Sequence, residues 1–432
     1  LTVYHEGQLD PVPSRQRAMT ESDLRLLAIS EGRSGVPGLF SKLAERREWL
    51  ATGHNILASI DVNTARFHER GFTRYEGRLE APQNLSALWQ RFGTRHQFSA
   101  TELEAYATCP FRFWVNSVLK VDDLVTPEEG TDYAARGSLV HVVLAQMLRE
   151  GLDLPEERLA ERFHELVQDH LAKRFHETEL QRALTSIEER LLTEWGRAFA
   201  RQQINYAAQL QEVWTGGVSA LPPEIPFGNP GGRVAGEEAT DPLVFGSGNA
   251  IVNVRGRIDR VDTGFAAGHR VFNVIDYKTG NPPRSTENEL RAGRSLQLAL
   301  YALAIRRLGI AGVDAESYQM GYWSLKATGF KRGYQRDNKT LNAMPTDLVS
   351  SLEQAMDEVI PKLARGIRDG KFLVENSDEN CTGHCPLHTS CRVNQIRPLT
   401  QSLNKIGDIL GYPSDTSQNI ESQPDPGDES RG

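Results

Sequence analysis

The sequence predicts an α/β fold, because strand-like and helix-like patterns alternate along most of the chain. Two apolar runs over 250–261 and 271–278 have the short, β-branched character of strands. Longer segments over 156–214, 287–308 and 347–368 place apolar residues at helical spacing. We therefore expect a central sheet flanked by helices, with 156–214 as a helical insertion whose charges form mostly a solvated face.

The two strand-like runs both end in charged side chains. Asp259 lies near the end of the first run, and Asp276 lies near the end of the second, two residues before Lys278. Residues i and i+2 of a strand point to one face, so Asp276 and Lys278 project together, and Asp259 joins them if the runs pair. The plain alternative is a solvated Asp-X-Lys turn whose ion pair contributes little stability.

Two carboxylates beside an amine suit one kind of chemistry. Carboxylate oxygens are hard ligands for Mg²⁺ or Mn²⁺. A lysine beside such an ion can orient or help deprotonate a water and can stabilise developing negative charge. The pattern of Asp259, Asp276 and Lys278 therefore predicts phosphodiester hydrolysis.

Length and composition set broad limits on the class of protein. The 432 residues, 39% of them hydrophobic and 25% charged, suffice for one large core or two to three domains of a soluble globular protein. No run of 18 apolar residues and no signal pattern occurs, so we expect a cytoplasmic protein without a membrane partner. The net charge of −8 excludes a protein surface that is basic throughout, but it allows a locally basic surface that faces DNA.

The N-terminal part shows no chemical constellation. Helical periodicity over 1–95 is interrupted by Pro and Gly, and the chain begins at Leu1, so we expect a fragment or a processed product. No G-x-x-x-x-G-K-[ST] motif offers an ATP site. Ser99 with Glu102 three residues later predicts a capping box that starts a helix leading to Cys109.

The middle of the chain contains further candidates. His141 lies in an apolar helical run after Gly137, where a histidine is either a core residue or, as a neutral imidazole, a ligand better suited to Mn²⁺ than to Mg²⁺. Glu224, Glu237 and Glu238 occupy a Pro- and Gly-rich segment; one of them could assist a metal through a water, although a surface edge strand is favoured.

The segment after Lys278 predicts a helix over 287–308, a strand over 317–325 and a basic loop over 326–339. Gln297 and Tyr301 lie four residues apart, hence on one helix face. Such a pair is most often structural. The basic loop could bind phosphates or be merely solvated.

Four cysteines form one pattern in which a distant first residue precedes a C-terminal triplet. Four thiols in a cytoplasmic protein suggest a metal rather than disulfides, and tetrahedral zinc is the generic expectation. They are Cys109, Cys381, Cys385 and Cys391.

Six segments in this order resemble the PD-(D/E)XK nuclease domain of the RecB family, over about residues 98–395. The resemblance is strongest to the iron–sulfur form at the C-terminus of AddB-type helicase–nuclease subunits. The segments are Y-A-T-C-P-F-R-F-W (106–114), R-G-S-L-V-H (136–141), G-R-I-D-R-V-D (256–262), V-I-D-Y-K-T-G (274–280), Q-L-A-L-Y (297–301) and the cysteine cluster ending at Cys391.

The resemblance implies a restriction-endonuclease-like core with a central mixed sheet. It implies that a Mg²⁺ or Mn²⁺ ion is held by side chains and one backbone carbonyl, that a lysine activates the water, and that a Gln–Tyr pair steadies the DNA backbone. The implied ligands are His141, Asp259, Asp276 and the carbonyl of Tyr277; the lysine is Lys278, and the pair is Gln297 and Tyr301.

The resemblance also implies a [4Fe–4S] cluster on Cys109, Cys381, Cys385 and Cys391. The first gap of the triplet has three residues where the family usually has two. We expect a structural staple rather than electron transfer, because no flavin motif or redox substrate site accompanies the cysteines. Linking Cys109 to Cys391 closes a loop of 283 residues, which as a cross-link would contribute roughly 5 to 6 kcal/mol of loop entropy.

The implied organisation has three parts. Residues 1–95 are the end of a preceding helicase-like region with a linker, 96–395 are the nuclease domain, and 396–432 are a disordered tail. The implied function is a Mg²⁺-dependent DNA exonuclease that processes double-strand breaks for recombinational repair with an AddA-type helicase–nuclease. The alternative is a catalytically inactive nuclease-like module that only grips DNA or a partner.

Overall fold

The computed structural model describes residues 14–33, 42, 55, 58–59, 61–62, 74–121, 132–174, 178–228, 240–326, 329–334, 341–374 and 381–391. The predicted disordered tail lies outside these residues, and so do Glu237, Glu238 and half of the basic loop expected over 326–339. The loop prediction is wrong for Gly329–Arg332, which form a strand. No described helix is both long enough and apolar enough to cross a bilayer.

The central feature is a five-stranded mixed sheet in the order β2-β6-β7-β8-β9. Its middle strand β7 pairs antiparallel with β6 and parallel with β8. From Val271 to Tyr277 every residue of β7 is buried, as expected of a strand covered on both faces. The strands are β2 (Thr215–Ala220), β6 (Arg260–Ala266), β7 (His269–Lys278), β8 (Glu316–Ser324) and β9 (Gly329–Arg332).

A second, smaller sheet is built around β5, which pairs parallel with β1 and antiparallel with β3 and β4. Its strands are β1 (Gln97–Ser99), β3 (Ile225–Phe227), β4 (Leu243–Phe245) and β5 (Val252–Ile258). The predicted single strand over 250–261 is therefore wrong, because the chain leaves one sheet and enters the other at Asp259. The predicted α/β fold with mixed sheets flanked by helices is confirmed.

The hairpin to which Asp276 belongs also differs from the expectation. Residues 260–266, expected mostly as loop, form β6 and pair with β7 up to Ala266 and His269. The connecting residues Ala267 and Gly268 have φ angles of +49° and +85°. Left-handed conformations at both central positions match the right-handed twist of paired strands, so two residues suffice for the turn.

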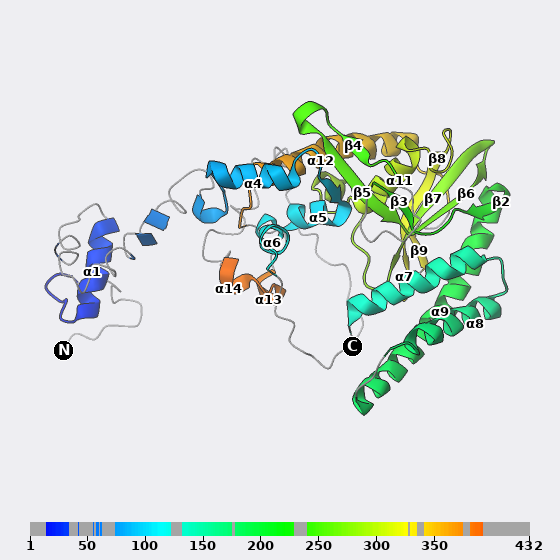
Figure 1. Ribbon diagram of the computed structural model, residues 1–432, viewed down its shortest axis with the longest axis horizontal. Coiled ribbons are helices and arrows are strands. Elements are labelled where there is room, and N and C mark those ends of the chain that lie inside the picture. Colours follow the sequence, from blue (N-terminus) through cyan, green and yellow to red (C-terminus); the bar gives the residue numbers. More distant parts are fainter. Residues whose placement is uncertain are drawn as a thin grey trace, which may run out of the picture.

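Helices cover both faces of the five-stranded sheet (Figure 1). One face of β7 and β8 forms a hydrophobic core with α11, α12, α5 and α4. The other face forms a core with α7, α8 and α9. These helices are α4 (Pro82–Phe92), α5 (Ala100–Thr108), α7 (Tyr133–Glu150), α8 (Glu156–Leu171), α9 (Glu179–Val213), α11 (Gln297–Arg307) and α12 (Thr346–Arg368).

The other α-helices of the described residues are short, apart from α1 near the N-terminus. They are α1 (Glu21–Arg33), α6 (Pro110–Phe113), α10 (Glu287–Arg291), α13 (Cys381–His384) and α14 (His388–Cys391). The predicted capping box of Ser99 and Glu102 at the start of α5 is confirmed. The single helix expected over 287–308 is wrong: the chain breaks between α10 and α11, where Gly293 has a φ of +76°.

Candidate functional site

Asp276 and Lys278 point from the end of β7 toward the first turn of α11. The Lys278 Nζ atom lies 2.6 Å from Asp276 Oδ2. The Gln297 amide bridges the pair, since its Nε2 donates to Asp276 Oδ1 at 2.7 Å and its Oε1 accepts from Lys278 Nζ at 3.1 Å. The same Nε2 donates to the Tyr301 hydroxyl at 3.1 Å. The four residues expected from D-Y-K and Q-L-A-L-Y thus lie in one hydrogen-bonded cluster.

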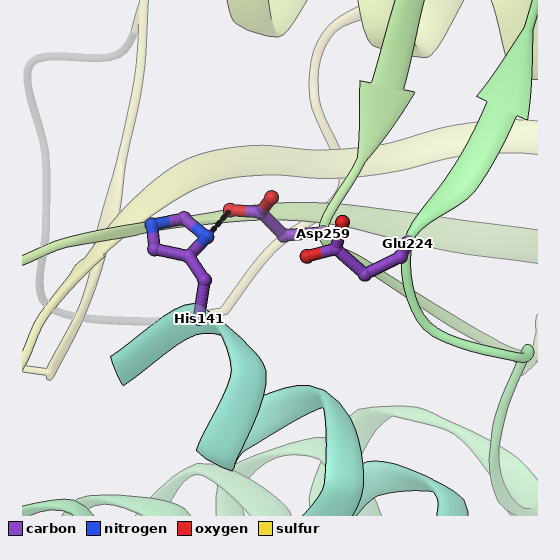
Figure 2. Close-up of side chains that lie close together, drawn as sticks. All are labelled: His141, Glu224 and Asp259. Carbon is purple, nitrogen blue, oxygen red and sulfur yellow. Dashed lines mark ion pairs between the residues drawn. The ribbon is translucent and has the colours of Figure 1, made fainter. Parts of the chain in front are cut away.

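Asp259 lies at the break between β5 and β6 and is fixed to the end of β7. Its Oδ2 atom accepts a hydrogen bond from the backbone N–H of Tyr277 at 2.8 Å. The same oxygen lies 3.3 Å from the Nδ1 atom of His141, a residue of α7 (Figure 2). Helix α7, the β5–β6 junction and the end of β7 therefore meet beside Asp276.

Glu224, one of three glutamates for which the sequence favours a surface edge strand over a role at the metal, lies beside Asp259. Its carboxylate forms a group with His141 and Asp259 in which one potential ligand atom of each residue lies within 4.8 Å of the others (Figure 2). The expected edge strand is present as β3, yet the residue just before it faces the site. Glu224 has a φ of +60°, a strained conformation of the kind that collects at functional sites.

Asp276 lies outside that group of three, although its surroundings fit a cation. Its buried carboxylate has the Lys278 ammonium at 2.6 Å from Oδ2 and the Asp259 carboxylate close enough to raise its pKa. Two neighbouring buried carboxylates are costly unless positive charge compensates both. Three carboxylates are ligands that Mn²⁺ and Mg²⁺ both accept, and an added imidazole suits Mn²⁺ better than Mg²⁺.

The electrostatics of the site indicate an excess of negative charge. Burial and the charge of Asp259 raise the pKa of Asp276 to about 7. Burial lowers the pKa of His141, but the hydrogen bond and charge of Asp259, with smaller contributions from Asp276 and Glu224, raise it to about 8. Burial and then Asp259 raise the pKa of Glu224. In the absence of a metal ion, protonation of these groups reduces their mutual repulsion. A bound divalent ion would neutralise the same groups and displace the protons.

Packing around Tyr301 explains why the G-R-I-D segment begins with a glycine, Gly256. A Cβ atom added at Gly256 would lie 2.6 Å from the Phe227 ring and 3.0 Å from Tyr301 Cε1. Phe227 and Tyr301 pack edge to face, with ring centroids 6.1 Å apart. A bare backbone at this point of β5 therefore lets both rings lie against the strand.

Behind the site, a buried polar network joins α9 to the sheet. Arg260 pairs with Asp262 at 2.9 Å and donates to Gln203 on α9 and to the Tyr277 hydroxyl. Tyr206 on α9 donates to Asp262 at 3.0 Å. These bonds hold the side chain of Tyr277 on the face of β7 opposite Asp276, and they tie the helical region to the strand that carries the site.

The other three cysteines lie close enough to Cys109, at the junction of α5 and α6, to influence its charge, and none of the four forms a disulfide among the described residues. Burial, opposed by a hydrogen bond from the Arg112 N–H and reinforced by the other three cysteines, raises the pKa of Cys109 to about 11. Cys381 and Cys391 pack with Val374 and Phe111. Among the described residues, no three of these thiols lie within 4.8 Å of one another.

Comparison with known proteins identifies the family of the chain. Residues 97–392, more than half of the chain, match the family model of the PD-(D/E)XK nuclease superfamily. The chain belongs to this superfamily. The resemblance inferred from its motifs is thereby confirmed, and the mixed α/β architecture is consistent with a restriction-endonuclease-like fold.

Curated relatives point to one type of protein within this nuclease superfamily, the B-type subunit of an ATP-dependent helicase/deoxyribonuclease. The chain is 30% identical over 244 residues to the protein of this type from Symbiobacterium thermophilum, and 27% identical over 244 residues to that from Carboxydothermus hydrogenoformans. Each alignment covers 54% of this chain and 20% of the relative. A protein of the same name from Desulfitobacterium hafniense is 27% identical over 236 residues, covering 52% of this chain and 18% of the relative. The chain thus spans about one fifth of the relatives it matches.

Proposed function

We propose that the protein is a metal-dependent DNA exonuclease domain that hydrolyses phosphodiester bonds. The observation that carries this proposal is the convergence of Asp259 and Asp276 beside Lys278, with Asp259 hydrogen-bonded to the backbone of Tyr277. A nuclease that uses a divalent ion needs carboxylates for the ion and a cationic group for the water and phosphate, and these side chains supply both.

Each residue has a distinct role in the proposed reaction. Lys278 orients the attacking water and stabilises negative charge on the phosphate, and the Gln297 amide keeps its ammonium group aligned. Tyr301, bonded to Gln297, steadies the DNA backbone. A bound Mg²⁺ or Mn²⁺ supplies Lewis acidity and a water of lowered pKa. The groups that would hold it are His141, Glu224, Asp259, Asp276 and the backbone carbonyl of Tyr277.

For the biological setting we propose the processing of double-strand DNA ends for recombinational repair in the bacterial cytoplasm. The names of the relatives support DNA as substrate and a helicase as partner, and we take the partner to be an AddA-type helicase–nuclease. We assign residues 96–395 to the nuclease domain, in agreement with the family match that begins at residue 97, and residues 1–95 to a preceding region.

We propose that the four cysteines hold a structural [4Fe–4S] cluster. The proposal is supported by the resemblance of the cysteine pattern and by the proximity of the other three cysteines to Cys109, which contributes to the raised pKa of its thiol. The N–H group of Arg112 points at Cys109 Sγ, and hydrogen bonds to sulfur tune such clusters. Absorbance near 400 nm in anaerobically purified protein tests this assignment, and stoichiometric zinc without iron contradicts it.

The proposed activity is tested by digestion of linear DNA with Mg²⁺, using the anaerobically purified chain beside Lys278→Ala. We expect degradation by the parent and loss of about 10²- to 10³-fold in rate for the variant. Lys173→Ala, which removes an exposed lysine on the turn after α8, is the matched control and should digest normally. An inactive DNA-gripping module would instead bind DNA equally in all three proteins and cut it in none.

A further inference from the structure

The start of α11 is capped by a side chain from a different helix. The first N–H groups of a helix have no partners within it, and Leu296, at the N-cap position, provides no side-chain hydrogen bond. Instead, the Glu104 Oε1 atom accepts from the backbone N–H of Leu296 at 2.6 Å and from that of Gln297 at 3.0 Å. Glu104 belongs to α5, 192 residues earlier than Leu296.

The break before α11 explains how α5 comes so close. Gly293, with a φ of +76°, turns the chain between α10 and α11. A Cβ atom at Gly293 would lie 2.9 Å from Ala107 Cβ on α5 and 2.9 Å from Leu363 on α12. Ala107 and Glu104 are three residues apart and therefore share one face of α5. The face of α5 that packs against the α10–α11 connection thus also brings the Glu104 carboxylate to the first N–H groups of α11.

The residue held by this cap is the one that organises the hydrolytic side chains. Gln297 is the first residue of α11, and its amide contacts Asp276, Lys278 and Tyr301. Glu104 is also close enough for the Lys278 charge to oppose the burial that raises its pKa. Any movement of the α11 start would shift the amide that aligns Lys278 with Asp276.

We propose that Glu104 is a positioning residue of the nuclease site, which acts by capping α11 and thereby fixing Gln297 against Asp276 and Lys278. This inference rests on the proposed function. Glu104 does not contact Asp276 or Lys278 through any hydrogen bond of the described residues, so its effect on catalysis passes through Gln297.

The test compares Glu104→Ala, Gln297→Ala and the double variant of the 432-residue chain in Mg²⁺-dependent digestion. Each single variant should lower kcat by about 10- to 100-fold, the scale of a misplaced catalytic group. The double variant should be no slower than the slower single variant, because both changes break one chain of contacts. Glu104→Gln keeps an acceptor oxygen and should recover part of the rate; it also serves if Glu104→Ala does not fold.

Ser99→Ala separates positioning from stability. It removes the capping box of α5 without touching Gln297, so it should lower the melting temperature by a few degrees and leave kcat within about twofold of the parent. A Glu104→Ala variant whose kcat equals that of Ser99→Ala, or a double variant whose losses multiply, would overturn the proposal.

Amide hydrogen exchange gives a readout that needs no nuclease activity. Glu104→Ala should speed exchange at Leu296 and Gln297 by at least about tenfold. Ser99→Ala should not, because within the described part of the chain Glu104 is the residue that accepts from these two N–H groups. Unchanged exchange in Glu104→Ala would overturn the cap itself. Faster exchange in Glu104→Ala, combined with a parent chain that digests no DNA, would instead show that the proposed function has failed while the cap is real.

Discussion

The carboxylate of Asp259 accepts a hydrogen bond of 2.8 Å from the backbone N–H of Tyr277 and thereby joins the two sheets of the protein. Asp259 stands where the chain passes from β5 to β6, and Tyr277 lies between Asp276 and Lys278 on β7. This bond positions the two aspartates relative to each other before any ion binds.

The cost of burying Asp276 should be visible in the stability of the metal-free protein. Its pKa in the folded protein is raised from 3.8 to about 7, so the folded state holds a proton that the unfolded state releases. The free energy of unfolding should therefore fall as the pH rises from about 4 to 7. A shift of about three pKa units corresponds to at most about 4 kcal/mol.

Asp276→Asn should remove this pH dependence, so that the metal-free variant melts at a higher temperature than the parent at pH 8. The exposed Asp314 provides the control, since Asp314→Asn should melt like the parent at every pH. His141, whose folded pKa is raised to about 8, contributes stability below about pH 6.5 that is lost as the pH rises through 8, so a smaller slope should remain in Asp276→Asn. Equal melting curves for parent and Asp276→Asn at pH 8 would show that the buried carboxylate carries no such cost.

Glu224 should contribute directly to metal affinity. Its carboxylate lies in one group with His141 and Asp259, so Glu224→Gln should weaken Mn²⁺ binding, measured by calorimetry, by about 10- to 100-fold. Glu316→Gln changes an exposed glutamate at the start of β8 and should bind Mn²⁺ like the parent. Unaltered affinity in Glu224→Gln would place Glu224 outside the metal site.

Gly256 should tolerate no side chain. In Gly256→Ala the added methyl group would overlap the Phe227 ring and press on Tyr301, so we expect a loss of about 1 to 3 kcal/mol in the free energy of unfolding and a displaced Tyr301. A Cβ atom added at Gly280 would meet nothing within 4 Å, so Gly280→Ala should unfold like the parent in the same urea titration. A Gly256→Ala variant as stable as the parent would contradict the close packing of the two rings on β5.

Replacement of the cysteines should destabilise the nuclease fold. Cys109 ends α5, the helix that presses on the α10–α11 break, so loss of a cluster there should loosen α5 as well as the C-terminal triplet. We expect the quadruple serine variant to melt well below the parent and to lose any absorbance near 400 nm. A quadruple variant with the parent's melting temperature would refute the proposal that a cluster held by the four cysteines stabilises the fold.

The parts of the fold that could be predicted from the sequence are those whose signal is local. The capping box at Ser99, the buried strand ending at Lys278 and the Gln297–Tyr301 face of α11 follow from spacing within one turn or one strand. The break at Asp259 has no comparable signal, because the apolar run continues on both sides while the two halves join different sheets.

The sequence offers Glu224 only as the less favoured alternative and assigns Glu104 no role, for a related reason. Glu224 precedes a strand of three residues in a Pro-rich segment, and only the pairing of β3 with β5 brings it to Asp259. Glu104 caps a helix that begins 192 residues later. Contacts of this kind depend on tertiary packing, which residue spacing within one segment does not encode.

The most direct test of the metal site is anomalous scattering from crystals grown with Mn²⁺. We expect one peak bounded by His141, Glu224, Asp259 and Asp276, with oxygen atoms of both aspartates at about 2.2 Å from the ion. A peak elsewhere on the chain, or an Asp259 side chain turned away from Asp276 with no ion between them, would contradict the proposed nuclease site.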